Sequence, residues 1–361
     1  MVRKTTAPAG WWQRLAAWLR ERGRDPALWA LVLAGLALGA CFFDPGVRWT
    51  RSRFEHVIVL DVTQSMNVAD QRLEGRAVSR LAYAKHALNQ TLAQLPCGSK
   101  LGWAIFTEYR SYLLFTPVEV CANRAELRST LAAIDGRMAW SGNSEIAKGV
   151  HSGITISKAL PGTPSLVFIT DGQEAPPLEA RHRPHFDDKP GDVAGLIVGV
   201  GELKASPIPK LDPLGRAIGF WGADEVAQVD PRNAGRGGSV AAEKMVEDDA
   251  ASAGAGLGAV PGSEHLSALR DAYLRLLAHD NGFAYLHLRS AQDFSAALQA
   301  AALARPVQVR GDARLVLVAL ALLLLLVPHG LALRAQWARS RARASAALAA
   351  RSPGAARSGR P

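Results

Sequence analysis

The sequence predicts an α/β protein in which a doubly wound, mostly parallel sheet carries helices on both faces and two transmembrane helices flank it. Between residues 56 and 303, short apolar runs rich in β-branched residues alternate with helical patterns. Such runs are typical of strands that are buried on both faces. Two long apolar segments, 27–43 and 315–333, enclose this block. The composition, 48% hydrophobic and 20% charged, excludes wholesale disorder.

The elements of the block alternate in a regular order. A strand at 56–61 (HVIVLD) precedes a helix over 79–95, whose leucines 81, 88, 92 and 95 share one face. Residues 101–107 and 111–118 predict a hairpin. Further helices are expected over 123–134, 144–159, 265–280 and 293–303, and further strands over 165–170, 196–200 and 284–288. Residues 231–263, rich in Gly, Ala and acidic residues, predict a mobile loop.

The net charge of +10 belongs to the two ends of the chain. Basic residues gather in 1–26 and 334–361, and the part between them is nearly neutral. A neutral middle excludes a nucleic-acid-binding surface of the usual basic kind. Lys and Arg beside a membrane span stay on the cytoplasmic side. Both ends are therefore expected to be cytoplasmic tails, with the intervening block across the membrane.

The two apolar segments are each close to the roughly 20 residues that span a bilayer. For the first, an alternative is a cleaved signal, since residues 38–41 (LGAC) resemble a lipoprotein signal-peptidase box with Cys41 as the lipidated residue. The long basic stretch before it favours an uncleaved span. Upstream, either an amphipathic helix on the inner membrane surface or an unstructured tail is expected from Trp11, Trp12, Trp18, Arg14 and Arg20.

Polar residues follow two of the predicted strands, at the sheet edge where ligands bind in this fold class. Residues 61–65 (DVTQS) follow the first strand, Thr170-Asp171-Gly172 ends a later one, and Ser144 opens a helix. In an extended turn alternate residues point the same way, so Asp61, Thr63 and Ser65 can face one point. Hard oxygen donors with few carboxylates suit Mg²⁺, with Ca²⁺ or Mn²⁺ as alternatives. The competing interpretation is that the two aspartates merely cap loops and helix starts.

This pattern resembles the metal-ion-dependent adhesion site (MIDAS) of the von Willebrand factor A (VWA) domain: Asp-x-Ser-x-Ser, a distant Thr, and Asp before Gly. The resemblance covers about residues 54–303. It implies direct ligation by Thr63, Ser65 and Ser144, with Asp61 and Asp171 acting largely through water. Thr63 replaces a Ser and Ser144 a Thr, and both keep the hydroxyl. An Asp or Glu of a partner protein would complete the shell. Contacts with that partner are expected from Gln64, Met66, Asn143, Gln173, Glu174, His182 and His185.

Three further stretches narrow the resemblance: 170–177 (TDGQEAPP), 189–201 (KPGDVAGLIVGVG) and 208–221 (IPKLDPLGRAIGFW). They are similar to bacterial membrane VWA proteins encoded beside MoxR-type AAA+ ATPases, most of all to the methanol-oxidation-cluster member. This implies an inner-membrane protein whose periplasmic domain helps to assemble or metal-load a client enzyme, a calcium- and quinone-dependent methanol dehydrogenase. Relatives serving other periplasmic enzymes remain an alternative. Other membrane VWA proteins and a MoxR-type ATPase are further expected partners.

Two features near this site carry alternatives of their own. In a VWA fold Cys97 and Cys121 come close enough for a disulfide, which an oxidising compartment favours over two buried thiols. The stretch with His182, His185, Asp187 and Asp188 predicts either a second metal site or a solvated rim loop. Prolines 176, 177, 184 and 190 replace the helix that the family places here, which predicts a specialised rim.

No enzyme is expected. The sequence has no nucleophile elbow, no phosphate-binding GxxxxGK[ST] loop and no Cys–His motif. Two alternatives to the adhesion-type module stay open. One is a metal-independent membrane scaffold with a vestigial site, which the substitutions at Thr63 and Ser144 favour. The other is a metal-dependent hydrolase, for which only Glu174 is near enough to Asp171 in sequence to act as a base.

Overall fold

The computed structural model describes residues 25–43, 46–178, 183–228, 244–246 and 262–350, together with Gly23. The chain divides into two compact units. One is Ser52–Val307, and the other combines the two chain ends, Met1–Arg51 and Gln308–Pro361. His182, most of the loop expected at 231–263 and the three tryptophans of the N-terminal tail lie outside the described residues.

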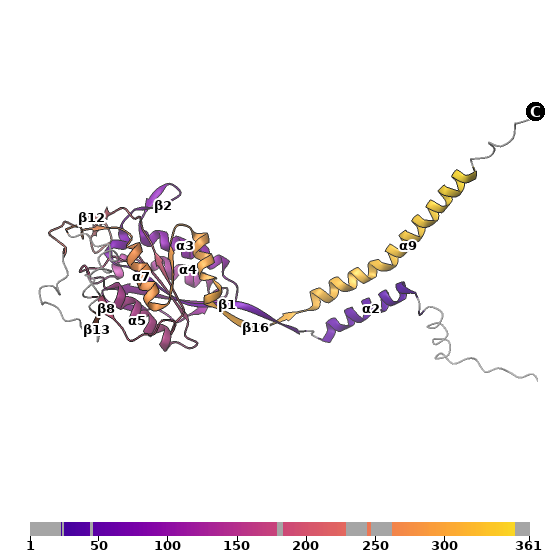
Figure 1. Ribbon diagram of the computed structural model, residues 1–361, viewed down its shortest axis with the longest axis horizontal. Coiled ribbons are helices and arrows are strands. Elements are labelled where there is room, and N and C mark those ends of the chain that lie inside the picture. Colours follow the sequence, from indigo (N-terminus) through magenta and orange to yellow (C-terminus); the bar gives the residue numbers. More distant parts are fainter. Residues whose placement is uncertain are drawn as a thin grey trace, which may run out of the picture. The chain divides into compact units, whose positions relative to one another are not determined.

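The larger unit is built on a central sheet of mostly parallel strands, with helices on both faces (Figure 1). Its path runs β15-β9-β7-β1-β4-β5, with β16 beside β1 and β6 beside β4. The strands along β15, β9, β7, β1 and β4 are parallel, and β5 and β6 run antiparallel to β4. The bounds are β1 Gly46–Asp61, β4 Lys100–Thr107, β5 Arg110–Leu113, β6 Val118–Glu119, β7 Ser165–Thr170, β9 Gly195–Gly199, β15 Ala284–His287 and β16 Ala304–Asp312. The predicted α/β class is confirmed.

The helices divide between the two faces, as the alternation of side chains along each strand requires. Ile58 and Leu60 of β1 pack into one core, whereas Val57 and Val59 pack into the other. The first core is covered by α3 (Arg80–Gln94), α4 (Arg124–Ala133) and α8 (Ala291–Leu298). The second is covered by α5 (Ile146–Ala159) and α7 (Asp271–Asn281). Two buried layers explain why the central strands are apolar without interruption.

Three predicted elements differ from the structure. The helix expected over 265–280 begins only at Asp271, because Leu266–Ser267 forms a strand, β14, against β10 (Ser206–Pro207). The last helix is α8 followed by a 3₁₀ turn at Ala301–Leu303, rather than one helix over 293–303. The second hairpin strand ends at Leu113, before Pro117, which lacks the N–H that a strand interior needs.

Short elements make up the rim of the unit. They are the strands β2 (Gln71–Leu73), β3 (Arg76–Val78), β8 (Arg183–His185), β11 (Pro209–Leu211), β12 (Ala217–Phe220) and β13 (Lys244–Val246), and the 3₁₀ turns Gln64–Asn67 and Gly136–Met138. Strand β2 pairs with β3, β11 with β12, and β13 with β8. Among the described residues of the proline-bearing stretch 171–194, the structure contains no helix.

The amino-terminal end of the sheet is closed by a disulfide. Cys97, just before β4, is bonded to Cys121, just after β6, across 24 residues of sequence. Glu119 accepts hydrogen bonds from the backbone amides of Gly98 (2.5 Å) and Ala122 (2.6 Å) beside it. The third cysteine, Cys41, is free.

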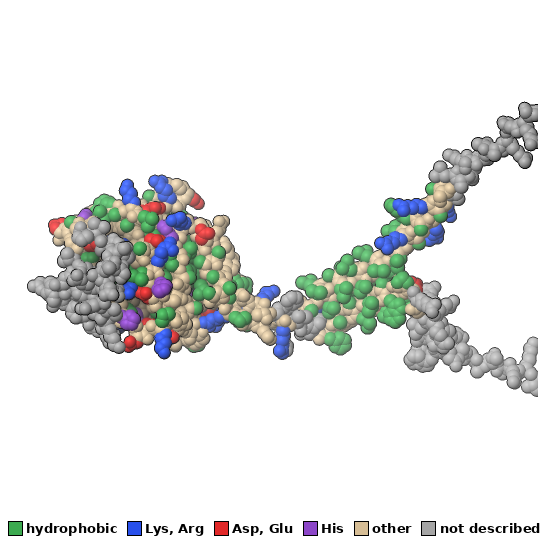
Figure 2. All heavy atoms as spheres, viewed as in Figure 1, with side chains coloured by type: hydrophobic (Ala, Val, Ile, Leu, Met, Phe, Trp, Pro, Cys, Tyr) green, Lys and Arg blue, Asp and Glu red, His purple; other side chains and the backbone are tan. Residues whose placement is uncertain are grey.

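The smaller unit contains two apolar helices, α2 (Pro26–Ala40, extended by a 3₁₀ turn at Cys41–Phe43) and α9 (Arg314–Ala350). They pack together through Ala34, Ala37 and Ala321, small residues that let helix backbones approach in a membrane. Pro26–Phe43 and Arg314–Ser345 are long and apolar enough to cross a bilayer. Hydrophobic side chains cover α2 and the first part of α9, and Lys and Arg lie further along α9 (Figure 2).

Candidate divalent-cation site

The candidate site lies where the order of the parallel strands reverses. Asp61 ends β1 and Asp171 follows β7, and these two strands are neighbours. From β1 the chain crosses to β4 on one side, whereas β7 lies on the other side. Connections that leave in opposite directions open a crevice at the carboxyl ends of the strands. The topology therefore places both aspartates at the position where this class of sheet binds its ligands.

Asp61 organises the loop after β1. One carboxylate oxygen accepts hydrogen bonds from the backbone amide of Thr63 (2.9 Å) and from its hydroxyl (2.6 Å). The other oxygen accepts from the hydroxyl of Thr170 at 2.6 Å. The Thr63 hydroxyl donates its proton to Asp61, so the lone pairs of its oxygen remain available. This oxygen lies 3.4 Å from the oxygen of the Ser65 hydroxyl.

Ser144 reaches the same site from a distant part of the chain. Its backbone forms a two-way bridge with Ala175, with N–O distances of 2.6 and 2.8 Å. Among the described residues, its buried hydroxyl has no hydrogen-bond partner. A buried polar group without a partner costs roughly 1–3 kcal/mol. Ser144, Thr63 and Ser65 line one cavity of about 440 Å³, so the three hydroxyls that the sequence nominated come together.

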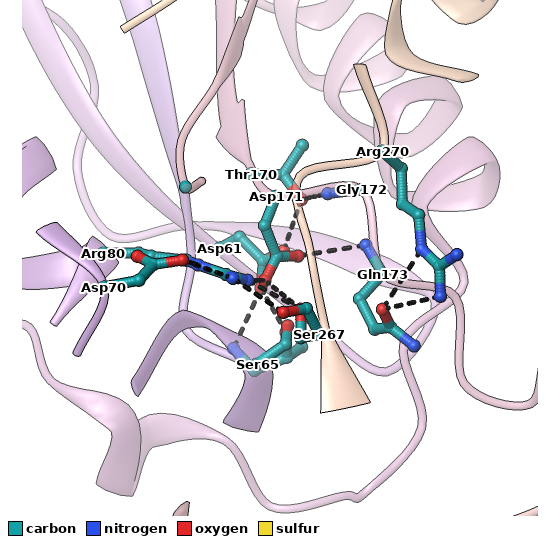
Figure 3. A network of polar contacts seen from close by, with 12 residues as sticks. Asp61, Ser65, Asp70, Arg80, Thr170, Asp171, Gly172, Gln173, Ser267 and Arg270 are labelled. Atoms are coloured by element: carbon teal, nitrogen blue, oxygen red, sulfur yellow. Dashed lines mark hydrogen bonds and ion pairs between the residues drawn. The ribbon is translucent and has the colours of Figure 1, made fainter. Parts of the chain in front are cut away.

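Asp171 is held by a network that the sequence did not reveal (Figure 3). One of its oxygens accepts from the guanidinium of Arg80 at 2.6 Å and from the hydroxyl of Ser267 at 3.2 Å. The other accepts from the backbone amide of Gln173 at 3.0 Å. Gly172, next in the chain, has φ +80° and directs the turn away from the strand, a conformation that glycine adopts without strain. Both oxygens of Asp171 are therefore engaged within the protein.

The electrostatics of the site are those of two carboxylates brought together out of water. Asp61 and Asp171 are both fully buried. Burial, and then repulsion by Asp171, raise the pKa of Asp61 to about 7 in spite of the hydrogen bonds from Thr170 and Thr63. Negative charge at such a spot calls for positive charge nearby. Arg80, itself fully buried, supplies one such charge.

The residues present fit a hard divalent cation. The three hydroxyl-bearing residues line a shared cavity, and one of the hydroxyls is otherwise without a partner among the described residues. The two aspartates are tied back by their own hydrogen bonds. A cation at this point would be held by Thr63, Ser65 and Ser144, with positions left for water or a carboxylate from outside. Mg²⁺ accepts such an arrangement because it keeps several waters.

The structure separates the predicted partner contacts into two groups. Gln64 and the exposed Asn143 line the cavity over the three hydroxyls, as does Glu174. Met66 and Gln173 do not fit the prediction, because both are buried. The side chain of Met66 packs into the core under α3. The side-chain amide of Gln173 is bonded to Glu264 at 2.8 Å and to Arg270 at 3.1 Å.

The rim loop does not assemble a second metal site among its described residues. His185 is exposed and lines a separate cavity of about 450 Å³. Asp188 is taken up by ion pairs with His151 and Lys158. Within the described part of the chain, the one group of three His, Cys, Asp or Glu ligands close enough for a metal is Cys97, Glu119 and Cys121. Two of these are joined in the disulfide, so this cluster is structural.

Glu174 acts as a tether at the start of α5. One of its oxygens accepts from the hydroxyl of Tyr273 at 2.5 Å and from the backbone amide of Ile146 at 3.1 Å. Burial is the main cause that raises the pKa of this carboxyl to about 8. This carboxyl therefore fastens α7 to the start of α5.

Residues 56–173 match the profile of the von Willebrand factor type A domain. Three solved structures are among those matched. An aerotolerance-related membrane protein from Bacteroides fragilis is 15% identical, with 68% of this chain and 96% of that chain covered and a TM-score of 0.44. A membrane-spanning protein from Vibrio fischeri is 16% identical, with 68% and 96% covered and a TM-score of 0.25. The ArnB paralog VWA2 from Sulfolobus acidocaldarius is 13% identical, with 44% and 38% covered and a TM-score of 0.29.

A search of curated proteins gives no match. Residues 56–173 thus match the VWA-type profile, and the observed sheet order with helices on both faces is a VWA-like α/β fold.

Proposed function

We propose that this protein is a membrane-anchored, cation-dependent protein-binding module. Thr63, Ser65 and Ser144 hold Mg²⁺, and an Asp or Glu side chain of a partner protein completes the coordination. The observation that carries the proposal is the buried Ser144 hydroxyl, which has no partner among the described residues and lines the same cavity as Thr63 and Ser65.

The arrangement supports binding better than catalysis. The two buried aspartates are engaged by hydroxyls, a guanidinium and two backbone amides. Glu174, the base nearest to Asp171 in sequence, is tied to Tyr273 and Ile146. Two other carboxyl groups line the cavity: Glu225 is paired with Lys210, and one oxygen of Glu264 accepts from Gln173. The three hydroxyls are well placed to hold a cation without reacting.

The cavity has room for a protein side chain above the hydroxyls. Ile208 and Trp221 contribute apolar wall, and Pro176 adds to it. A carboxylate that enters from a partner would meet the cation at the base and these apolar groups at the sides. Shielding from water strengthens such an ionic contact, so this geometry favours a protruding acidic side chain over a flat surface.

The setting of this module is part of the proposal. The apolar helices α2 and α9 anchor the chain in a bacterial inner membrane, with both basic tails cytoplasmic and the VWA-type domain in the periplasm. The disulfide between Cys97 and Cys121 is consistent with an oxidising compartment. The resemblance of 170–177, 189–201 and 208–221 supports a periplasmic client under assembly or metal loading, with methanol dehydrogenase as the leading choice. Other membrane VWA proteins and a MoxR-type ATPase would act beside it.

A pull-down from gently solubilised membranes tests this function. The tagged full-length chain is captured in Mg²⁺ and in chelator, and Asp61→Ala is compared with Glu126→Ala, an exposed acid on α4. We expect a partner that is retained by the wild type and Glu126→Ala in Mg²⁺ and lost with chelator or Asp61→Ala. Mass spectrometry then identifies the client. A partner retained under all conditions would contradict the proposal and support the metal-independent scaffold.

A further inference from the structure

We infer that Arg80 is a positioning residue that weakens the site's hold on its cation, by keeping one oxygen of Asp171 for itself. The inference rests on the proposed function, since it concerns the same cation site. Arg80 opens α3, and its side chain is completely buried. It does not line the cavity over the three hydroxyls. Its effect on the site therefore passes through Asp171.

The guanidinium is fixed by partners on three elements (Figure 3). One terminal nitrogen donates to Asp171 and to the Ser267 hydroxyl, both at 2.6 Å. The other terminal nitrogen donates to the Ser267 carbonyl at 3.0 Å and to Asp70 at 2.6 Å. The Nε donates to the same oxygen of Asp70 at 3.0 Å. A planar fork held at so many points keeps its orientation, so Arg80 does not move aside easily.

The surroundings of Arg80 are shaped to hold it. Gly201 has φ +129°, and a Cβ atom placed there would lie 2.7 Å from the Arg80 Nε. No other residue therefore fits at position 201 while Arg80 stays where it is. Asp70 is fixed in turn by the backbone amide of Glu202, at 3.0 Å. The space and the hydrogen bonds together form a site built for an arginine.

The consequence for cation binding follows from charge. Arg80 and a cation over the hydroxyls both carry positive charge, and both are attracted to Asp171. Two like charges near one carboxylate compete, and their repulsion is strong in a buried site. Asp70 moderates this competition because it shares the guanidinium with Asp171. The affinity of the site then rests more on the carboxylate that a partner adds.

Opposite effects are expected from substitutions of Arg80 and of Asp70, the other carboxylate that Arg80 binds. Arg80→Gln removes the competing charge, so binding of the cation should tighten. Asp70→Asn removes a negative charge, and Asp171 is then the one carboxylate that still pairs with Arg80. Binding of the cation should therefore weaken. If the network served only to hold the fold, either substitution would loosen the site, and neither would improve its affinity.

The test is a titration of the full-length protein in detergent with Mn²⁺, in which electron paramagnetic resonance counts the free ion. We expect Arg80→Gln to lower the dissociation constant about tenfold or more and Asp70→Asn to raise it about fivefold. Arg128→Gln, which removes an exposed arginine on α4, should leave it unchanged. Melting curves with and without Mn²⁺ should show a larger stabilisation by the ion in Arg80→Gln than in the wild type.

The outcomes separate the inference from the proposed function. If the wild type binds Mn²⁺ and Arg80→Gln binds it equally or more weakly, the inference is overturned while the cation site stands. If Arg80→Gln does not fold, an affinity of Asp70→Asn that is unchanged or higher overturns the inference. If neither the wild type nor any variant binds Mn²⁺, the proposed function falls and the inference falls with it.

Discussion

Strand β1 carries two fully buried ionisable residues, His56 and Asp61, and their surroundings differ. His56, toward the start, has both ring nitrogens engaged, with the Ser165 hydroxyl at 2.5 Å and the Leu298 carbonyl at 3.1 Å. Asp61, at the end, accepts from the hydroxyls of Thr63 and Thr170. The Ser144 hydroxyl, which lines the same cavity as Thr63, has no partner among the described residues. The ring nitrogens of His56 thus both have partners, whereas the cluster near Asp61 keeps oxygen atoms that are available to a ligand.

The difference shows which polar groups serve the fold and which serve a ligand. At the amino end of the sheet, side chains pair with one another and the Cys97–Cys121 disulfide closes the structure. At the carboxyl end, adjacent strands β1 and β7 send their connections in opposite directions, and a cavity opens over the hydroxyls. Substitutions at the amino end should therefore leave cation binding unchanged, and those at the carboxyl end should change it.

The largest expected effect on stability comes from an arginine at each end of the sheet. Arg80→Met leaves Asp70 and Asp171 buried without their counter-ion and should lower the free energy of unfolding by about 3–5 kcal/mol. Arg305→Met removes the partner of Glu55 at the other end, in a pair that is partly exposed, and should cost about 1 kcal/mol or less. Denaturant unfolding of the full chain in detergent measures both. Equal losses of unfolding free energy in the two variants would contradict the expected difference between the buried ion pairs of Arg80 and the partly exposed pair of Arg305.

Removal of the disulfide is the next largest change. Replacing Cys97 and Cys121 by Ser frees a loop of 24 residues' separation and should lower the free energy of unfolding by about 3 kcal/mol. The cation site lies at the opposite end of β1 and β4, so we expect the Mn²⁺ affinity of the double variant to stay within about twofold of the wild type. A large loss of affinity would show that the two ends are coupled.

Acid should destabilise the amino-end cluster. Burial lowers the pKa of His56 from 6.5 to about 4, so the folded protein keeps this ring neutral where the unfolded chain binds a proton. Stability is therefore lost as the pH falls below about 6.5, by about 2 kcal/mol at pH 5. Unfolding curves of the wild type and His56→Gln over this range measure the difference. If the two pH dependences coincide, His56 is not responsible.

The smallest expected changes in unfolding free energy come from two serine-to-alanine substitutions, one at each end of the sheet. Ser165→Ala removes a hydroxyl that bonds His56 and the Glu55 carbonyl, and it should cost about 1 kcal/mol. Ser144→Ala removes a hydroxyl without a partner, so the free energy of unfolding should stay within about 0.5 kcal/mol of the wild type or rise slightly. A loss at Ser144 as large as that at Ser165 would mean that its hydroxyl already serves the fold.

Much of this architecture could be predicted from local sequence patterns. The runs that become β1 and β7 are apolar because both of their faces are buried, and Asp61 and Asp171 stand out because they end such runs. Ser144 was named from its place at the start of a predicted helix and aligned by the family resemblance, and it lines the same cavity as the other two hydroxyls. The roles of these residues as ligands stay predictions.

What the sequence did not reveal depends on contacts between distant residues. Arg80 was missed because its partners Asp171 and Ser267 lie 91 and 187 residues away. One signal was present: a lone arginine in the first turn of a helix opposes the helix dipole, so it needs a reason to be there. The start of α7 was misplaced for a related reason, since Leu266–Ser267 is held as a strand by Ser206–Pro207.

The most direct test of the cation site is an equilibrium titration of the full-length wild type, Ser144→Ala and Ser165→Ala with Mn²⁺. We predict one bound ion per wild-type chain, an affinity at least about tenfold lower for Ser144→Ala, and an unchanged affinity for Ser165→Ala. Equal affinities for all three proteins, or no binding by the wild type, would contradict the assignment of Ser144 and with it the proposed adhesion-type function.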